Sequence, residues 1–371
     1  MQQIGKSQLA ILIMLFMIGS TPLFELGIKA KQDSWIAMTV AATVGLILLV
    51  LYIRLQKRAP SVGIADLYKF HFGRYIGGAV GVIQAMWFAY ESMRNVRDFG
   101  ELTTMALLGF TPKWIIMLII LLVSAYTASK GVEVFVRVVQ LLLPVVVISY
   151  GLLILLVFSS GLVKLGRLLP MMENGPMPIV QAVFPDLLSF PFGQMVVMLV
   201  FWSLVKEKNL IGPASYKAYL IVSAFLVGMN MLIMCVLGPQ LSALTALPLL
   251  QVVQLVRLAN FLERLDIIVT LLLYTGLYVK ITTLFIASIL TVNAVTGISQ
   301  RSLVFPIGAF IYGMSFLEPN NTYHIWIGLD ITLKIVPLFQ IVLPLAMLVV
   351  GIRKRYRAEA AEGLRSLQAE K

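Results

Sequence analysis

The sequence predicts an all-α integral membrane protein of about ten transmembrane helices, arranged as a five-plus-five inverted repeat with broken first and sixth helices. Of the 371 residues, 60% are hydrophobic and only 12% are charged, and the mean hydropathy is +0.94. Soluble domains are about 45–50% apolar. Apolar segments of about 18 or more residues recur along the chain, and each can cross a hydrocarbon core about 30 Å thick as a helix. Proline and glycine interrupt two of these segments, at matching positions of the two halves.

Five spans are expected before residue 159. The N-terminal sequence MQQIGKSQLAILIMLF has neither a charged n-region nor an A-x-A cleavage site. It is therefore interpreted as the start of the first membrane helix and not as a signal peptide. The five segments are Ser7–Ile28, Ser34–Ile53, Tyr75–Asn95 with an extension to Gly109 left open, Lys113–Ala128 and Val132–Phe158.

A polar connection, Ser159–Pro178, separates the halves, because its sequence GRLLPMMENGPMP favours turns over helix. The second half is expected to contain the spans Ile179–Val205, Pro213–Leu237, Leu265–Thr291, Leu303–Phe316 and Ile331–Ile352. We therefore expect one transmembrane domain over residues 1–371, with repeats at residues 7–160 and 178–352 and a basic cytoplasmic tail at residues 353–371.

The distribution of lysine and arginine predicts that both termini are cytoplasmic. With an even number of spans, three cation-rich segments fall on one side of the membrane: the second-to-third loop, the sixth-to-seventh loop and the C-terminal tail. Their cations are Arg54, Lys57, Arg58, Lys69, Arg74, Lys206, Lys208, Arg353, Lys354, Arg355 and Arg357. The opposite loops are poorer in cations, and the cytoplasmic loops of membrane proteins carry the excess of positive charge.

The two interrupted spans predict a ligand site at the centre of the bundle. The first break lies in MIGSTPLFELG, and the second lies in FPDLLSFPFG, where Pro185, Pro191 and Gly193 stand inside an apolar run. Backbone polar groups in a bilayer need partners, so a break is tolerated only inside protein or beside a wet cavity. The N–H groups of half-helices at such a point suit a carboxylate. The alternative is that both kinks serve packing alone.

Candidate ligand contacts come from the first, third, sixth and eighth spans. Residues of the first break offer backbone groups and hydroxyls to a ligand, and residues four apart on the third and eighth spans share a helix face. The alternatives are hydroxyls that satisfy their own kinked helix and phenylalanine rings that pack against lipid. The full set is Gly19, Ser20, Thr21, Tyr90, Arg94, Ser189, Phe190, Phe192, Thr270 and Tyr274.

Charged residues on the third span need partners or water. Arg94 inside a membrane helix is costly unless it is paired, and the candidate partners are Glu91, Asp98 or the ligand. For Arg97, Asp98 and Glu101 the sequence favours a solvated charge lattice at the wet end of the helix.

Two further charges are expected at the membrane surface. Lys280 on the eighth span is expected to reach the cytoplasmic end by snorkelling, and Glu25 is expected at the outer interface. Coupled transport requires a titratable group or an oxygen cage near the first and eighth spans. Because both residues are expected at the periphery, the sequence favours a sensor over a coupled transporter.

Two stretches carry a family resemblance. FPFGQMVVMLVFW, Phe190–Trp202, resembles the Phe-Pro-Phe-Gly-Glu segment of the GerAB-type spore germination permeases. LPLLQVVQLVRLANFLERLDIIV, Leu247–Val269, is similar to their Leu-Glu-Val-Val-Arg and Asn-Phe-Leu-Glu-Arg-Leu-Asp pattern, and the basic RKRYR also resembles theirs. The resemblance covers essentially the whole chain. In one departure, Gln194 stands where the family pattern has Glu.

The resemblance implies the B subunit of a nutrient germinant receptor, with the LeuT-like fold of the amino acid/polyamine/organocation superfamily. It places the chain in the inner membrane of a spore, surrounded by membrane lipid. Its implied partners are a small nutrient, often an amino acid, a multi-spanning A subunit and a lipoprotein C subunit. Members of the family are thought to sense their ligand and not to pump it.

The segment Leu247–Leu265 mixes apolar residues with glutamine, arginine and asparagine, which is typical of an amphipathic helix in the outer interface. In a transporter fold such a connection acts as an external gate. The following NFLERLD run is expected to form a structural salt-bridge cluster of Glu263, Arg264 and Asp266.

Other classes of function are excluded or disfavoured. The net charge of +12 comes mostly from loops and helix ends, so nucleic acid is not expected as a partner. Only one cysteine and two distant histidines are present, which excludes a His/Cys metal cluster but not a carboxylate site. No catalytic motif occurs, so neither an enzyme nor a cofactor is expected. The competing functions are an amino-acid sensor and an amino-acid transporter coupled to protons or sodium, with a purely structural subunit as a third reading.

Overall fold

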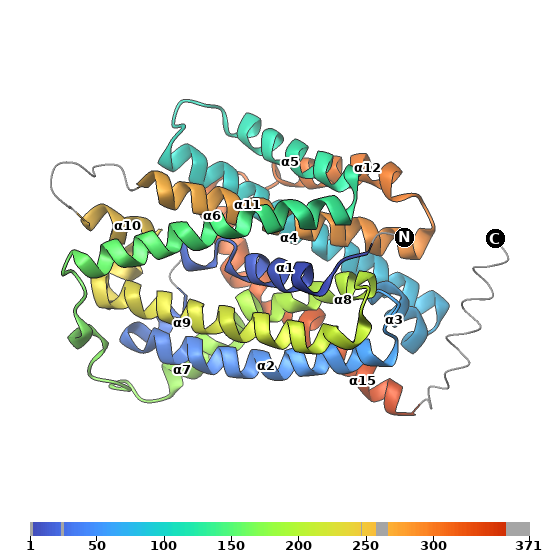
Figure 1. Cartoon of the computed structure of the whole chain (residues 1–371), viewed down its shortest axis with the longest axis horizontal. Helices are drawn as coiled ribbons and strands as arrows, with labels where there is room; N and C mark the ends of the chain where they lie inside the picture. The colour runs from blue at the N-terminus through green and yellow to red at the C-terminus, as the bar shows by residue number, and fades with distance from the viewer. Residues whose placement is uncertain (1–2, 24–25, 246, 257–265, 354–371) are drawn as a thin grey trace.

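The computed structural model describes residues 3–23, 26–245, 247–256 and 266–353. These residues form a helical bundle in which α2, α6, α9 and α11 run roughly along one direction (Figure 1). The helices are α1 Lys6–Ile18, α2 Ser34–Arg58, α3 Ile64–Phe72, α4 Arg74–Ala106, α5 Lys113–Lys130, α6 Val132–Ser159, α7 Met177–Ala182, α8 Met198–Phe201, α9 Ile211–Leu244, α10 Pro248–Leu255, α11 Asp266–Thr296, α12 Gln300–Met314, α13 Asn321–Trp326, α14 Leu333–Pro337 and α15 Leu343–Arg353.

Short helical turns connect several of them. They are η1 Thr21–Leu23, η2 Ile28–Asp33, η3 Leu165–Leu168, η4 Val183–Phe192, η5 Gly193–Val197, η6 Trp202–Leu204, η7 Lys208–Leu210, η9 Ile327–Thr332 and η10 Leu338–Val342.

The prediction of about ten spans is confirmed. In the part of the chain that the structure describes, seven helical segments are long and apolar enough to cross a membrane. Three more long helices bring the count to ten. They are α1, whose 13 residues stop at the first break, α4, whose 33 residues include charged side chains, and α12, with 15 residues.

Both predicted backbone breaks are present. Helix α1 ends at Ile18, and Gly19 then takes φ 34° and ψ −122°, a conformation that costs glycine far less than other residues. In η4 the wide helical turns are interrupted by extended backbone at Phe184 and Phe190. The chain resumes a helical course at Gly193.

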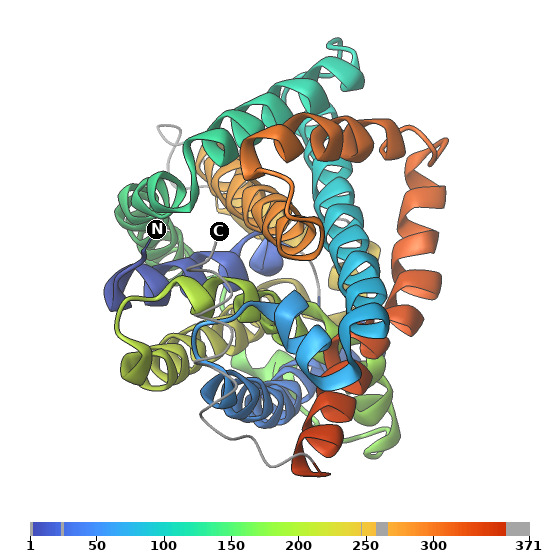
Figure 2. The same cartoon turned by 90° about the vertical axis from the view of Figure 1, so that its right-hand side faces the viewer.

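The sixth span lies in the interior of the bundle. In the most apolar 18-residue window of Met177–Leu204, 83% of the residues are buried. In the corresponding window of Val132–Ser159, only 28% are buried. Figure 2 views the bundle along its long direction and shows α11 inside the ring of other helices, where it packs against α1, α4, α5 and α6. The two broken segments and α11 are therefore the elements that build the centre.

Helix α3 was not predicted, because the second-to-third connection was interpreted as a basic loop. Its sequence IADLYKFHF buries one face, formed by Ile64, Ala65, Leu67, Tyr68 and His71. Helix α10 covers the first part of the predicted amphipathic segment, and it packs against α9, α11 and η1. The salt-bridge cluster predicted after it involves Glu263 and Arg264, which lie outside the described residues, as does Glu25.

Candidate functional site

Lys280 connects the two broken segments. Its side chain is completely buried. The aliphatic stem lies so close to Gly19 that a Cβ placed there would meet the Lys280 Cγ, Cδ and Cε atoms. The ammonium lies 4.0 Å from the ring centroid of Phe190 and donates a hydrogen bond to Gln194 Oε1 at 3.1 Å. One side chain of α11 thus reaches from the first break to the second.

The sequence-based placement of Lys280 at the membrane surface was wrong. Lys280 lies near the midpoint of α11, roughly 20 Å along the helix from either end, which is farther than a lysine stem can snorkel. The signal was present in the sequence, because no other charged residue occurs for several helical turns on either side of Lys280. The premise that no titratable group lies near the first and eighth spans is therefore also wrong.

Gln194 links Lys280 to Glu91 on α4. Its Nε2 atom donates to Glu91 Oε2 at 3.0 Å, while its Oε1 accepts from Lys280. Among the side chains that the structure describes, Lys280 has no carboxylate within ion-pair distance. The ammonium is instead held by one neutral amide and by the faces of two aromatic rings, those of Phe190 and Phe16. Sequence reasoning did not assign Gln194 or Glu91 to the site.

The first break is packed against α11. A Cβ on Gly276 would overlap the backbone of Gly19, so the two backbones are in direct contact. The Thr21 hydroxyl donates to the Met17 carbonyl at 2.7 Å and so satisfies the end of its own helix, which is the structural alternative weighed from the sequence. Ser20 is also buried.

The second break is satisfied by side chains from two other helices. Gln340 Nε2 donates to the Ser189 carbonyl at 3.1 Å. The Tyr52 hydroxyl, which donates to the Gln340 carbonyl at 2.5 Å, also donates to the Gly193 carbonyl at 3.5 Å. These bonds supply the partners that broken backbone requires within a bilayer. Phe192 faces away from Lys280 and packs against Tyr219, with 5.8 Å between the ring centroids.

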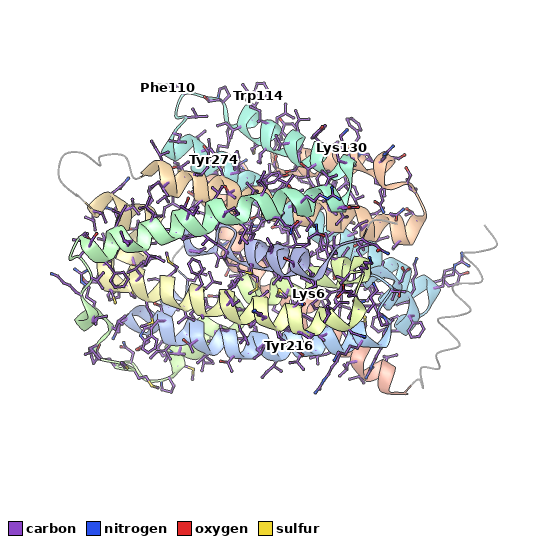
Figure 3. All side chains as sticks on the ribbon, in the orientation of Figure 1. Lys6, Phe110, Trp114, Lys130, Tyr216 and Tyr274 are labelled. Atoms are coloured by element: carbon purple, nitrogen blue, oxygen red, sulfur yellow. The ribbon has the colours of Figure 1, made fainter. Side chains whose placement is uncertain are left out.

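Three further predicted site residues lie elsewhere on α4 and α11: Tyr90 on α4, and Thr270 and Tyr274 on α11. The Tyr90 hydroxyl bonds to the Thr332 hydroxyl at 2.9 Å. Thr270 and Tyr274 lie about 120–160° around α11 from Gly276, so they share a face turned away from the first break. Tyr274, labelled in Figure 3, packs against Phe99 of α4, and its buried hydroxyl has no hydrogen-bond partner among the described residues.

Arg94 belongs to a separate buried charge cluster. It pairs with Glu318 at 3.4 Å and donates to the His324 carbonyl at 3.1 Å. The candidates on its own helix, Glu91 and Asp98, attract it without a direct ion pair. His324 contacts a carboxylate through each ring nitrogen, Glu318 through Nδ1 and Asp98 through Nε2 at 2.8 Å. The sequence missed this arrangement because Glu318 and His324 lie more than two hundred residues from Arg94.

The charges farther along α4 are also buried. Arg97 and Glu101 are only 5% and 7% exposed and form an ion pair at 2.9 Å, which Lys113 of α5 joins. The predicted solvated lattice is therefore wrong for these two residues. Arg97 also donates to the Ser315 carbonyl at 2.9 Å, because the end of α12 covers this part of α4.

The hollows beside the breaks are narrow in this conformation. One lies between α1, α6 and α11 and admits no water molecule, and it is lined by Leu15, Ile18, Gly19, Val146, Tyr150, Leu272, Thr275, Gly276 and Val279. A second, of about 190 Å³ beyond the first break, has room for about one water. The side chains of Lys280, Gln194 and Phe190 fill the space where the breaks meet. We refer to this arrangement, in which Lys280 contacts both Gln194 and Phe190, as the closed state.

Solved structures with the same fold are membrane transporters. The transporter Mhp1, of the nucleobase-cation-symport-1 family, in a closed conformation with bromovinylhydantoin bound, is 14% identical, with a TM-score of 0.64 over 91% of this chain and 76% of that one. MhsT in complex with L-phenylalanine is 12% identical, with a TM-score of 0.63 over 95% of this chain and 99% of that one. These likenesses show the fold, a LeuT-like inverted repeat.

Sequence comparisons identify the family. Spore germination protein KB of Bacillus subtilis (strain 168) is 27% identical over 97% of this chain and 98% of its own length. Spore germination protein YndE of the same organism is 23% identical over 55% of each chain. The profile of the spore germination protein family, the spore permeases, matches residues 3–324. With that match over most of its length, the chain belongs to the spore germination protein family.

Proposed function

We propose that this chain is the nutrient-sensing B subunit of a germinant receptor in the inner membrane of a spore. In this proposal a small nutrient, an amino acid, binds between the two breaks and favours one conformation of the bundle. The change of conformation passes to the A and C subunits through their different affinities for the two states. Both termini then lie in the cytoplasm, and residues 7–160 and 178–352 form the two repeats.

The observation that carries the proposal is the meeting of the two breaks at Lys280, inside a chain of the spore germination protein family. Interrupted helices at corresponding positions of two repeats are where ligand sites occur in this type of fold. The MhsT structure of the same fold contains L-phenylalanine, which supports an amino acid as the class of nutrient.

One observation favours a second function, an amino-acid transporter coupled to protons or sodium. Lys280 is a buried titratable group on α11 beside the first break, and coupled transport requires a group of this kind. Sensor and transporter share a fold, so fold alone does not separate them. We retain the sensor as the main proposal because the sequence relatives are spore germination proteins over nearly the full chain.

Ligand-dependent stabilisation of the purified chain tests the proposal. We expect at least one amino acid from a panel of amino acids and sugars to raise the unfolding midpoint of the detergent-solubilised protein. A ligand at a hundred times its Kd adds about 2.7 kcal/mol of stability. No shift with any nutrient on the panel contradicts ligand sensing by this chain.

Uptake into proteoliposomes separates the two functions. The amino acid that stabilises the chain is supplied in labelled form, with and without an imposed proton or sodium gradient. A sensor binds the amino acid without accumulating it. Gradient-driven accumulation supports the transporter and contradicts the sensor.

A further inference from the structure

We propose that Lys280 and Glu91 are the two charge partners of a zwitterionic ligand, and that the Gln194 amide occupies the place of that ligand in the closed state. The inference rests on the proposed function, which supplies a ligand between the breaks, and it adds the chemistry that the ligand must have. An α-amino acid with both charged groups intact fits this chemistry, whereas a neutral sugar does not.

The first step is the unmet bonding capacity of Lys280. An ammonium has three N–H donors, and Lys280 makes one side-chain hydrogen bond, to Gln194, among the described residues. A buried cation without a paired anion costs several kcal/mol. The buried arginines of α4 are instead paired with carboxylates at 2.9 and 3.4 Å. Among the described residues, Glu91 and Asp98 attract Lys280 only from beyond ion-pair distance, so an incoming carboxylate would give Lys280 its first direct ion pair.

The second step is the orientation of the Gln194 amide. Its oxygen, the negative end of the amide dipole, faces Lys280, and its NH₂ group, the positive end, faces Glu91. The carboxylate and ammonium of an α-amino acid carry full charges of the same signs. Two carbon atoms separate a carboxylate oxygen from the ammonium nitrogen, whereas one carbon separates the amide oxygen and nitrogen. An amino acid thus reproduces both contacts with charged groups, which form stronger hydrogen bonds than an amide does.

The third step is access. Gln194 and Lys280 are buried, whereas Glu91 keeps a partial exposure on α4, so we place the entry of the ligand on the α4 side of the centre. Gln194 lies in η5, directly after the second break, and in this proposal its side chain changes rotamer to make room for the ligand. Replacement of Gln194 by the ligand releases the second break from α4 and α11. In this proposal the site has two states: a closed state, in which Gln194 contacts Lys280 and Glu91, and an occupied state, in which the ligand does.

Calorimetric titration of the full-length chain in detergent tests this inference. The probes are L-alanine, L-valine, L-asparagine, L-phenylalanine and D-glucose. Each amino acid that binds is compared with its carboxamide, which lacks the carboxylate, and with its des-amino acid, which lacks the ammonium. We expect each analogue to bind at least about tenfold more weakly than the amino acid, because close charge pairs contribute about 1.5 kcal/mol or more.

Two variants assign the partners. In Lys280→Met the ratio of amino-acid affinity to carboxamide affinity is expected to fall to about one. In Glu91→Gln the ratio of amino-acid affinity to des-amino-acid affinity is expected to fall to about one. The matched controls are Lys334→Met and Glu133→Gln, which change exposed residues of α14 and α6. They leave both ratios unchanged. Persistence of the wild-type ratios in Lys280→Met and Glu91→Gln overturns the inference.

The outcomes keep the inference and the proposed function apart. If an amino acid binds but its carboxamide binds equally well, or if only D-glucose binds, ligand sensing stands and the zwitterion inference is wrong. If no probe binds the wild-type chain, both are wrong. Should Lys280→Met fail to fold, the wild-type titrations with the analogues decide alone.

Discussion

At the scale of single residues, the buried charges near the centre fall into two kinds. Arg94, Glu318, His324 and Asp98 contact one another directly, so their charges are compensated within the protein. Lys280 contacts a neutral amide and aromatic rings. An ion removed from water costs several kcal/mol unless it is paired. The first kind is therefore expected to serve stability, whereas Lys280 is the charge with which we propose that a ligand carboxylate pairs.

The stabilising role of the first kind is tested by Glu318→Gln. The change removes the carboxylate shared by Arg94 and His324 without changing side-chain size, and loss of one partner from a buried pair costs about 3–5 kcal/mol. The midpoint of unfolding in detergent is expected to fall clearly. The control is Glu133→Gln, which breaks the exposed pair with Arg137 and costs at most about 1 kcal/mol. Equal midpoints for the two variants would mean that the cluster does not hold the fold together.

The residues at the breaks were partly predictable. Gly19 and Phe190 were identified from local chemistry, because glycine and proline mark interrupted backbone wherever they fall in an apolar run. The partners of Arg94 and the position of Lys280 were not identified. Both depend on the rotation of α4 and α11 about their axes and on segments far away in the sequence. Hydrophobic periodicity carries little of that information in helices that are apolar on nearly all sides.

At the scale of elements, the centre is built by close contact between α11 and the end of α1. Gly276 allows this approach, because any Cβ at its position would overlap the backbone of Gly19. The same contact brings Lys280, one turn later on α11, over the first break. Small residues at helix contacts are the usual means of close packing in membranes.

Gly276→Ala tests this contact. Overpacking of a tight contact costs about 1–3 kcal/mol, so the variant is expected to unfold at a lower temperature and to bind any ligand of the site more weakly. The control is Gly151→Ala on α6, where nothing lies within 4 Å of the added Cβ. There alanine is expected to be neutral or to stabilise by up to about 1 kcal/mol. If Gly276→Ala matches its control in stability and binding, α11 does not contact the first break.

Most elements followed from hydropathy, because a span must be apolar over a fixed length. The predicted start of the fourth span at Lys113 and of the fifth at Val132 coincide with α5 and α6. Helix α3 was missed since nine residues are too few for a span, although its buried face follows the helical period.

At the scale of the whole molecule, the connections gather at two ends of the bundle. The start of α1, the turn between α2 and α3 and the turn before α9 lie at one end, and the α6–α7 connection and α10 lie at the other (Figure 1). The first end carries Arg54, Lys57, Arg58, Lys69 and Arg74. Phe110, in the α4–α5 connection, and Trp114, in the first turn of α5, are exposed at the upper edge of the molecule in Figure 3.

The charge difference predicts that the α2–α3 end is cytoplasmic, and a matched pair of cysteine variants tests this orientation. Ser61 and Ser159 are both exposed serines, one at each end of the bundle. Each is changed to cysteine in a Cys235→Ala background, which removes the chain's single, buried cysteine. In intact bacterial cells expressing the chain, a membrane-impermeant maleimide is expected to label S159C and not S61C. In inside-out vesicles the pattern reverses. Labelling of S61C in intact cells contradicts cytoplasmic termini, because an even number of spans fixes both ends of the chain on the side of the α2–α3 turn.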